Sequence, residues 1–285
     1  MSDHPDNKIV YQGVPGANSH IACHEVYPDM EAVPCRTFED ALAAIAEGRA
    51  ALGMIPVENS VAGRVADIHH LLPESDLSIV GEHFLRVRHQ LMGVKGASLD
   101  TVKRVHSHPM ALGQCRKVIR ELALNAVTAA DTAGAAQEVA ALGGVEDAAI
   151  ASGLAARIYG LEVLRADVED AEHNTTRFLI LARDGREVPM GDGLIITSFV
   201  FRVRNVPAAL YKAMGGFATN GVNMTKLESY QLDGRFTATQ FYADIEGHPD
   251  ERRVHLALEE LAFFTTHLKI LGVYPASPLR ANIPD

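Results

Sequence analysis

Tryptophan is absent from the 285-residue sequence, and cysteine is scarce. The three cysteines, Cys23, Cys35 and Cys115, are widely spaced and form no C-x-x-C pair. An odd number of dispersed cysteines does not fit a disulfide framework or a structural zinc site. The thirteen histidines include no H-E-x-x-H pattern, which is the spacing of a common helical metal site. We therefore expect a reduced protein without a bound metal.

Positive charge is also in deficit, with 26 lysines and arginines against 36 aspartates and glutamates. The formal net charge is -10. A nucleic-acid-binding protein needs a basic face, so we expect no nucleic-acid partner. A small anionic substrate remains compatible with this balance, because a local site can be positive on a negative protein.

Long apolar runs are missing, and no stretch approaches the roughly 18 apolar residues of a membrane span. The opening residues, MSDHPDNKIV, lack the basic segment and apolar run of a signal peptide. We expect a soluble, cytoplasmic protein that does not enter a membrane.

The first two thirds of the chain alternate short apolar strands with amphipathic helices, which predicts sheets that are parallel and covered by helices on both faces. The clearest helix spans residues 37–48, where Thr37 is a cap and Gly48 a stop. A second helix is expected over residues 109–122. We expect two α/β lobes, with the chain crossing between them near residues 85–95 and 160–175.

Residues 184–193 are rich in glycine and charge and predict a linker. The remaining sequence predicts the order β-α-β-β-α-β, which is that of a ferredoxin-like domain. Its strands are expected at residues 194–203, 222–231, 234–247 and 266–275, its helices at 207–221 and 249–264, and a turn at Asp233–Gly234.

Small polar residues follow several predicted strands of the first region, at points where a helix is expected to begin. They are Asn18 and Ser19, the run Glu58, Asn59 and Ser60, the pair Ser107 and His108, the pair Asp131 and Thr132, and Ser152. Each residue can be explained as a helix cap. Together they also predict an anion site, because ligands of open α/β sheets bind beyond the carboxyl ends of the strands and helix N-termini attract negative charge.

The segment EHNTTRFLIL, residues 172–181, adds one arginine at the start of an apolar strand. Arg177 can hold a carboxylate through two parallel hydrogen bonds. The glycines do not match G-x-G-x-x-G or G-K-[ST], and the serines do not match G-x-S-x-G. We therefore expect neither a nucleotide cofactor nor a hydrolase triad.

The chain resembles the prephenate dehydratase family over residues 8–183. The resemblance is carried, in order, by YQGVPGANS, PVENSVAGRVAD, VHSHPMALGQC, DTAGAA, AAIAS, AARIYGL and NTTRFLIL. Residues 194–276, with GVNMTKLES and LKILGVYP, resemble the ACT regulatory domain of that family. The resemblance implies a catalytic region of two α/β lobes, folded like a periplasmic binding protein, with the active site in the cleft between them. Because the chain opens directly on the first predicted strand, we expect no fused chorismate mutase domain.

The resemblance also implies a reaction, in which prephenate loses carbon dioxide and water to give phenylpyruvate for phenylalanine synthesis. Aromatisation drives this step, so no cofactor is expected. Thr176, in the family signature Thr176-Arg177-Phe178, would donate a hydrogen bond to the departing hydroxyl, and Arg177 would bind a carboxylate. Glu58 and His108 are alternative proton sources. The residues expected to complete the substrate site are Asn59, Ser60, Ser107, Thr132, Ser152 and Phe178, although Phe178 also fits a core position.

Two other functions fit the same residues. One is arogenate dehydratase, which acts on the amino analogue of prephenate, and the other is a non-catalytic protein that binds small anions or amino acids. The family further implies a homodimer or homotetramer and feedback by phenylalanine. The effector residues would be Ala208, Ala209, Leu210, Asn223, Glu228 and Ser229. The family has glycine where this chain has Ala208, and arginine and proline where it has Tyr230 and Gln231, which predicts weaker phenylalanine binding.

Overall fold

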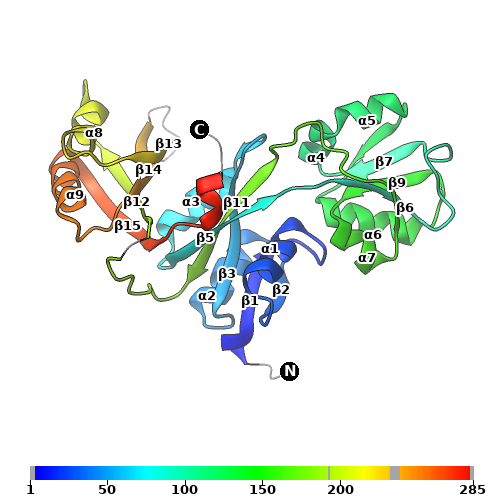
Figure 1. Ribbon diagram of the computed structural model, residues 1–285, viewed down its shortest axis with the longest axis horizontal. Coiled ribbons are helices and arrows are strands. Elements are labelled where there is room, and N and C mark those ends of the chain that lie inside the picture. Colours follow the sequence, from blue (N-terminus) through cyan, green and yellow to red (C-terminus); the bar gives the residue numbers. More distant parts are fainter. Residues whose placement is uncertain (1–3, 192, 232–237, 283–285) are drawn as a thin grey trace. The chain divides into compact units, whose positions relative to one another are not determined.

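The computed structural model describes residues 4–191, 193–231 and 238–282, which form helices and three β-sheets (Figure 1). The chain divides into two compact units. One contains Met1–Ile68 and His83–Phe178, and the other contains His69–Glu82 and Leu179–Asp285. The boundary between the units passes through two strands, β5 (Ser78–Arg86) and β11 (Thr175–Ala182). The domain limits expected at residues 183 and 194 remain predictions.

The first sheet has the strand order β2-β1-β3-β11-β5. Its other strands are β1 (Lys8–Gln12), β2 (Glu31–Cys35) and β3 (Leu52–Asn59), and the short β4 (Gly63–Arg64) pairs with β3. Strand β1 is parallel to both β2 and β3. The crossover helices are α1 (Asn18–Val26) and α2 (Phe38–Ala46).

Helix α2 forms where the sequence predicts it. The Thr37 hydroxyl accepts a hydrogen bond from the Asp40 amide at 3.1 Å, and Gly48 after the helix has φ +71°. Its buried face includes Ile45, which packs directly over Gly53 of β3. The cap and the apolar stripe are local signals, so this helix could be predicted from the sequence.

The second sheet has the order β10-β6-β9-β7-β8. Its strands are β6 (Gln90–Gly93), β7 (Arg104–Ser107), β8 (Asn125–Thr128), β9 (Asp147–Ala151) and β10 (Glu162–Arg165). Strand β7 is parallel to β8 and β9, whereas β6 is antiparallel to β9 and β10 is antiparallel to β6. The expectation of a purely parallel sheet is wrong here. Strands β6 and β10 lie next to the two chain crossings, so the chain enters this sheet through β6 and leaves it after β10.

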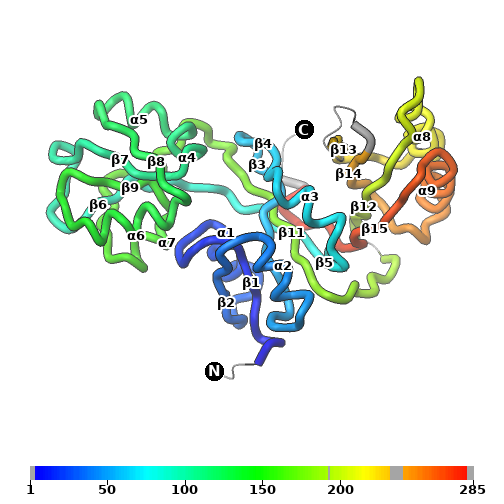
Figure 2. Tube along the Cα trace, turned by 180° about the vertical axis from the view of Figure 1, so that it is seen from behind, coloured from blue at the N-terminus to red at the C-terminus, as the bar shows by residue number. Residues whose placement is uncertain are grey.

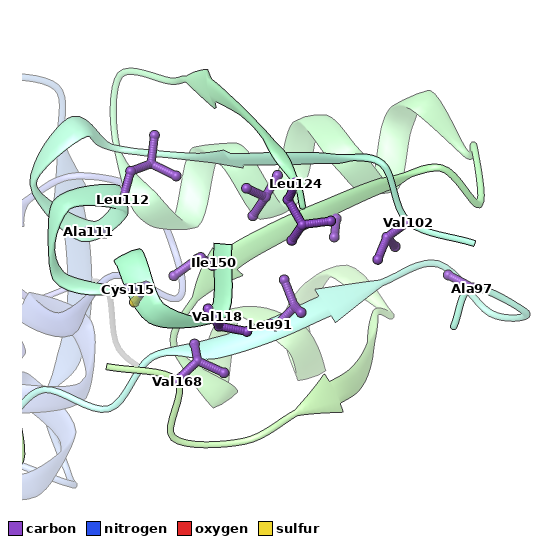
Figure 3. Packing of buried hydrophobic residues seen from close by; sticks show 12 residues of the cluster. Leu91, Ala97, Val102, Ala111, Leu112, Cys115, Val118, Leu124, Ile150 and Val168 are labelled. Atoms are coloured by element: carbon purple, nitrogen blue, oxygen red, sulfur yellow. The ribbon is translucent and has the colours of Figure 1, made fainter. Parts of the chain in front are cut away.

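Helices cover both faces of this sheet, and β9 divides its side chains between them. Ala148 and Ile150 pack with α4 (Pro109–Gln114) and α5 (Arg116–Glu121), as Figure 3 shows for Ile150 beside Cys115 and Val118. Ala149 and Ala151 pack with α6 (Thr132–Leu142) and α7 (Gly153–Tyr159).

The single helix expected over residues 109–122 is two helices that break at Cys115. Cys115 is fully buried and leaves helical geometry, with φ -124° and ψ 32°. The Asp170 carboxylate then accepts hydrogen bonds from the amides of Arg116 at 3.0 Å and Lys117 at 3.1 Å. A carboxylate at a helix N-terminus satisfies free amides, so Asp170 stabilises the start of α5.

The expected helix caps are correct at three of the strand ends. The side chains of His108, Asp131 and Ser152 accept from amides at the starts of α4, α6 and α7. The other two expectations are wrong. Helix α1 is preceded by Ala17, which makes no side-chain cap, and β3 leads into a turn toward β4 and not into a helix.

The third sheet has the order β13-β14-β12-β15, and the paired strands are antiparallel. Its elements are β12 (Ile195–Val203), α8 (Ala209–Thr219), β13 (Met224–Gln231), β14 (Ala238–Glu246), α9 (Arg252–Phe264) and β15 (Thr265–Pro275). This is the predicted β-α-β-β-α-β order. The expected turn at Asp233–Gly234 lies outside the described residues. Figures 1 and 2 show α8 and α9 on one side of this sheet, where both contribute to its core.

Residues 69–82 pack with this third sheet, which the sequence did not predict. His69, in α3 (Ala66–Glu74), makes a hydrogen bond of 2.6 Å between its Nδ1 and the hydroxyl of the buried Tyr230. Lys269 of β15 donates to the carbonyl oxygens of Pro73 and Ser75 at 3.1 and 2.7 Å. Arg280 holds the fully buried Glu82 carboxylate with two hydrogen bonds of 2.8 and 2.7 Å.

Backbone strain at the start of α8 gives a stability prediction. Ala208 has φ +59° and ψ 18°, the left-handed region that costs a residue with a Cβ roughly 1–2 kcal/mol. Ala208→Gly should therefore raise the free energy of unfolding by about 0.5–1 kcal/mol, part of the gain being offset by the freer unfolded chain. Urea unfolding followed by circular dichroism measures this change.

The matched control is Ala218→Gly, at an exposed helical position of the same helix. There the glycine should lower stability by about 0.5–1 kcal/mol. Equal destabilisation by both substitutions would show that the Ala208 backbone is not strained.

Candidate active site

Two polar segments lie together where β3 ends and β11 begins. The Ser60 amide donates to the Thr175 carbonyl at 2.9 Å, and the Thr175 amide donates to the Ser60 hydroxyl at 2.9 Å. The Ser60 hydroxyl in turn donates to the His173 carbonyl at 2.6 Å. Ser60 therefore aligns the two strands as well as lying in the candidate site.

Asn59 connects these segments to Thr176. Its Nδ2 donates to the Thr176 hydroxyl oxygen at 3.0 Å and to Asn174 Oδ1 at 2.8 Å. Its Oδ1 accepts from the amides of Val61 and Ala62 at 3.0 and 2.8 Å. A hydroxyl group that accepts one hydrogen bond can still donate another. The half-buried Thr176 is thus arranged to donate its hydrogen to a ligand.

Arg177 supplies a buried positive charge beside Thr176. The side chain is only 3% exposed, and its Nη1 donates to Glu58 Oε1 at 3.0 Å. The guanidinium also lies 5.9 Å from the centroid of the Phe84 ring, within reach of a cation–π contact. The sequence predicted a ligand carboxylate as the partner of Arg177. In the structure, the Glu58 carboxylate holds one of its donors.

Three residues of this cluster were missed at the level of sequence. Gln114 Oε1 accepts from Asn174 Nδ2 at 3.0 Å and lies 3.0 Å from His89 Nε2, and Gln114 Nε2 lies 3.4 Å from Asn59 Oδ1. Burial lowers the pKa of His89, so its imidazole favours the neutral form. Gln114 and Asn174 belong to motifs that carry the family resemblance, which could have drawn attention to them. His89 has no comparable signal.

The remaining predicted substrate residues make other contacts. The buried Ser107 hydroxyl donates to the Ile150 carbonyl at 2.6 Å, and His108 Nδ1 accepts from the Met110 amide at 3.2 Å. Thr132 is the first residue of α6, and Phe178 is 1% exposed and belongs to the core. The hydrogen bonds given above pair Glu58 with Arg177, Asn59 with Thr176 and Ser60 with Thr175. Among the described residues, none of these bonds extends to Ser107, His108, Thr132 or Phe178.

Ser152 links α7 to the loop after β1. Its hydroxyl donates to the Gly16 carbonyl at 2.5 Å and accepts from the Ala155 amide at 3.1 Å. Gly16 has φ +93°, and a Cβ there would lie 2.7 Å from the Ala155 Cα. Glycine is therefore required for this close approach. The Tyr159 hydroxyl adds a hydrogen bond to the Pro15 carbonyl at 2.8 Å.

The predicted effector residues lie at the start of α8 and on β13. Ala208 precedes α8, Ala209 and Leu210 open it, and Asn223 lies just before β13. Asn223 Nδ2 donates to Glu246 Oε2 at 3.0 Å, and Lys226 Nζ donates to Glu228 Oε1 at 3.3 Å. Ser229 is exposed, whereas Tyr230 is buried against His69.

Two kinds of feature are absent from residues 4–191, 193–231 and 238–282. Those ranges contain no cluster of three or more histidine, cysteine or acidic side chains able to bind a metal ion. None of the helices described is both long and apolar enough to span a membrane. The cytoplasmic location and the absence of a cofactor remain predictions.

The α/β fold and the polar cluster around Thr176 and Arg177 agree with a lyase that acts on a small anion. The family model of prephenate dehydratase matches residues 9–186. The chain belongs to the prephenate dehydratase family, which confirms both the resemblance and the expectation of an enzyme.

Two relatives of known name align with most of the chain. A bifunctional N-acyl-homoserine lactone acylase/prephenate dehydratase of Komagataeibacter europaeus is 54% identical over 95% of this chain and 97% of its own length. Arogenate dehydratase 2 of Petunia hybrida is 39% identical over 94% of this chain and 72% of its own length.

Two solved structures are similar throughout. One, described as a novel type of quorum quenching acylase, is 53% identical, with a TM-score of 0.89 over 96% of this chain and 99% of its own. The other is prephenate dehydratase of Arthrobacter aurescens in complex with L-Phe. It is 29% identical, with a TM-score of 0.86 over 94% of this chain and 89% of its own.

The contacts of Ser152 give a prediction that tests its structural contribution. Ser152→Ala removes a helix cap and the hydrogen bond to Gly16, and should lower the free energy of unfolding by about 1–2 kcal/mol. Thr132→Ala is the control, since Asp131 caps that helix, and it should change stability by less than about 0.5 kcal/mol. Thermal or urea unfolding measures the stability of both variants. Equal losses would show that the Ser152 hydroxyl contributes no more to stability than the Thr132 hydroxyl does.

Proposed function

We propose that this chain catalyses the decarboxylating dehydration of prephenate to phenylpyruvate. The observation that carries the proposal is the hydrogen bond from Asn59 Nδ2 to the Thr176 hydroxyl, next to the buried cation of Arg177. Together these groups offer a directed hydrogen-bond donor and a positive charge to an anionic substrate. Membership of the prephenate dehydratase family supports the same reaction.

Each group has a distinct task in the proposed reaction. The carbon–oxygen bond to the ring hydroxyl breaks, and the leaving oxygen takes up a proton to become water. The ring carboxylate leaves as neutral carbon dioxide, and its bonding electrons complete the aromatic ring. The Thr176 hydroxyl donates a hydrogen bond to the leaving oxygen as negative charge develops on it, and this stabilises the transition state. Glu58 and His108 are the candidate sources of the proton.

Arg177 is proposed to bind the substrate side-chain carboxylate. A guanidinium has five N–H donors, so one arginine side chain can donate to more than one carboxylate. Burial strengthens the attraction, because charges interact more strongly away from water. Asn59 and Ser60 line the same region, and Ser107, Thr132 and Ser152 remain proposed substrate residues of the surrounding strand ends.

Two other activities are suggested by relatives. The Petunia hybrida enzyme is an arogenate dehydratase, and the Komagataeibacter europaeus relative is also an N-acyl-homoserine lactone acylase, with 54% identity along nearly its whole length. The acylase is a second candidate function for that reason. Prephenate, arogenate and an N-acyl-homoserine lactone should be offered separately to the purified protein, with phenylpyruvate, phenylalanine and homoserine lactone as the products measured.

Residues 194–276 are proposed to be an ACT domain that binds phenylalanine. The β-α-β-β-α-β order supports this assignment, as does the L-Phe complex of the Arthrobacter aurescens relative. The start of α8, with Ala208, Ala209 and Leu210, would contact the amino acid together with Asn223, Glu228 and Ser229. A homodimer or homotetramer, as the family resemblance implies, completes the proposed assembly.

The role of Thr176 gives a kinetic prediction. Thr176→Ala removes the donor to the leaving oxygen and should lower kcat for prephenate roughly 100- to 1,000-fold. KM should change far less, because the interaction strengthens only in the transition state.

The matched control is Thr175→Ala. Neighbouring side chains of a strand point to opposite faces, so this variant should retain kcat within about threefold, an effect below 1 kcal/mol. A Thr176→Ala variant with normal kcat and a raised KM would contradict the assigned role.

The regulatory proposal predicts reciprocal coupling between two sites. Phenylalanine should bind the parent protein, and a non-reactive dicarboxylate analogue of prephenate should weaken that binding by about 5- to 150-fold. Ala208→Gly should bind phenylalanine more tightly, because it removes the methyl group that crowds the close backbone approach that a glycine permits. Calorimetric titration measures each affinity. No binding to either protein would discard the regulatory proposal, and equal affinity would discard the contribution of Ala208.

A further inference from the structure

We infer that His89 and Asn174 are positioning residues, which act through Gln114 and Asn59 to direct the Thr176 hydroxyl hydrogen toward the substrate. This inference rests on the proposed dehydratase activity. Neither residue was part of the predicted site. Both lie in the segments that cross between the first two sheets, His89 between β5 and β6 and Asn174 between β10 and β11.

The side-chain amide of Gln114 has one orientation that satisfies its neighbours. Asn174 Nδ2 donates to Gln114 Oε1 at 3.0 Å, and His89 Nε2 lies 3.0 Å from the same oxygen. Since that oxygen can only accept, His89 Nε2 carries a hydrogen and donates it. With Oε1 held by two donors, Gln114 Nε2 points toward Asn59 Oδ1, 3.4 Å away.

The side-chain amide of Asn59 also has one orientation that satisfies its neighbours. Its Oδ1 faces three donors, the amides of Val61 and Ala62 and Nε2 of Gln114. Its Nδ2 therefore faces Asn174 Oδ1 and the Thr176 hydroxyl oxygen. A reversed Asn59 amide would place oxygen against both acceptors, and Thr176 would then donate inward. The chain of amides thus fixes which way the Thr176 hydrogen points.

His89 and Asn174 are both buried, and hydrogen bonds hold the backbone of each residue. His89 is 3% exposed and Asn174 is 1% exposed. The His89 amide donates to Glu169 Oε2 at 2.9 Å, and its carbonyl accepts from Val168 at 2.8 Å. The Asn174 carbonyl accepts from Val87 at 2.8 Å. Backbone contacts therefore hold both side chains in place, as a positioning role requires.

A double-mutant cycle separates positioning from a general structural role. The variants are His89→Leu, which removes the donor, Thr176→Ala, and the two combined. His89→Leu should lower kcat for prephenate roughly tenfold, the effect of losing one orienting hydrogen bond. KM should stay within about twofold. In the Thr176→Ala background, His89→Leu should change kcat by less than about twofold, because residues that act through one group are not additive.

Two further variants keep the test decisive if His89→Leu folds poorly. His89→Gln keeps an N–H donor and should recover kcat to within about threefold of the parent. Asn174→Asp has the same shape but loses the donor to Gln114 Oε1, and should lower kcat roughly tenfold. Circular dichroism and urea unfolding show that each variant is folded at the assay temperature.

The outcomes distinguish the inference from the proposed function. If the parent protein does not convert prephenate, the proposed function fails. If the parent is active, an equal loss from His89→Leu in both backgrounds overturns the positioning role, as does a His89→Gln variant as slow as His89→Leu. Normal kcat in Asn174→Asp also overturns it.

Discussion

The pairing of β3 with β11 is the constraint on which the candidate site depends. Strand β3 lies in the first of the two segments that form the first unit, and β11 begins at the end of the second segment. Asn59 and Thr176 are 117 positions apart in the chain. Once they are adjacent, Glu58 meets Arg177, Asn59 meets Thr176, and Ser60 joins the backbone of Thr175. The strands of the second sheet come between β3 and β11 in the sequence. The two segments that connect the second sheet to the first therefore end beside the cluster around Asn59 and Thr176. The long insertion therefore positions the site from both of its ends.

The parts of the fold that could be predicted from the sequence have local causes. The α2 helix has its cap at Thr37 and its apolar stripe within a dozen residues, and the βαββαβ rhythm is visible in the alternation of strands and helices. The break at Cys115 could not be predicted, because the cap of α5 comes from Asp170, 54 positions beyond Arg116. The direction of β6 and β10 was missed for a similar reason, since strand direction depends on where the chain enters the sheet.

The residues of the candidate site also divide into those that could be predicted from the sequence and those that could not. Thr176 and Arg177 stand out in sequence because a hydroxyl group and a cation at the mouth of an apolar strand are unusual. Their partners do not stand out, because Gln114 and Asn174 are neutral amides and His89 is one histidine among thirteen. Amides act here through orientation, which depends on contacts between segments 25 to 117 positions apart. Serines that looked equivalent in sequence also differ in their surroundings. The hydroxyls of Ser60, Ser107 and Ser152 each donate to a backbone carbonyl, but only for Ser60 among these three is that carbonyl, of His173, next to Asn174 of the cluster.

The packing of residues 69–82 on the third sheet bears on whether this sheet forms an independent domain. A regulatory domain that folds alone can be gained, lost or exchanged between proteins as a unit. Here Tyr230 is buried by His69, and Glu82 supplies the buried carboxylate that holds Arg280. A fragment that began at residue 194 would uncover the Tyr230 side chain and leave Arg280 without that carboxylate. The third sheet is therefore not self-contained, because it packs with residues 69–82, which precede it by more than a hundred positions in the chain.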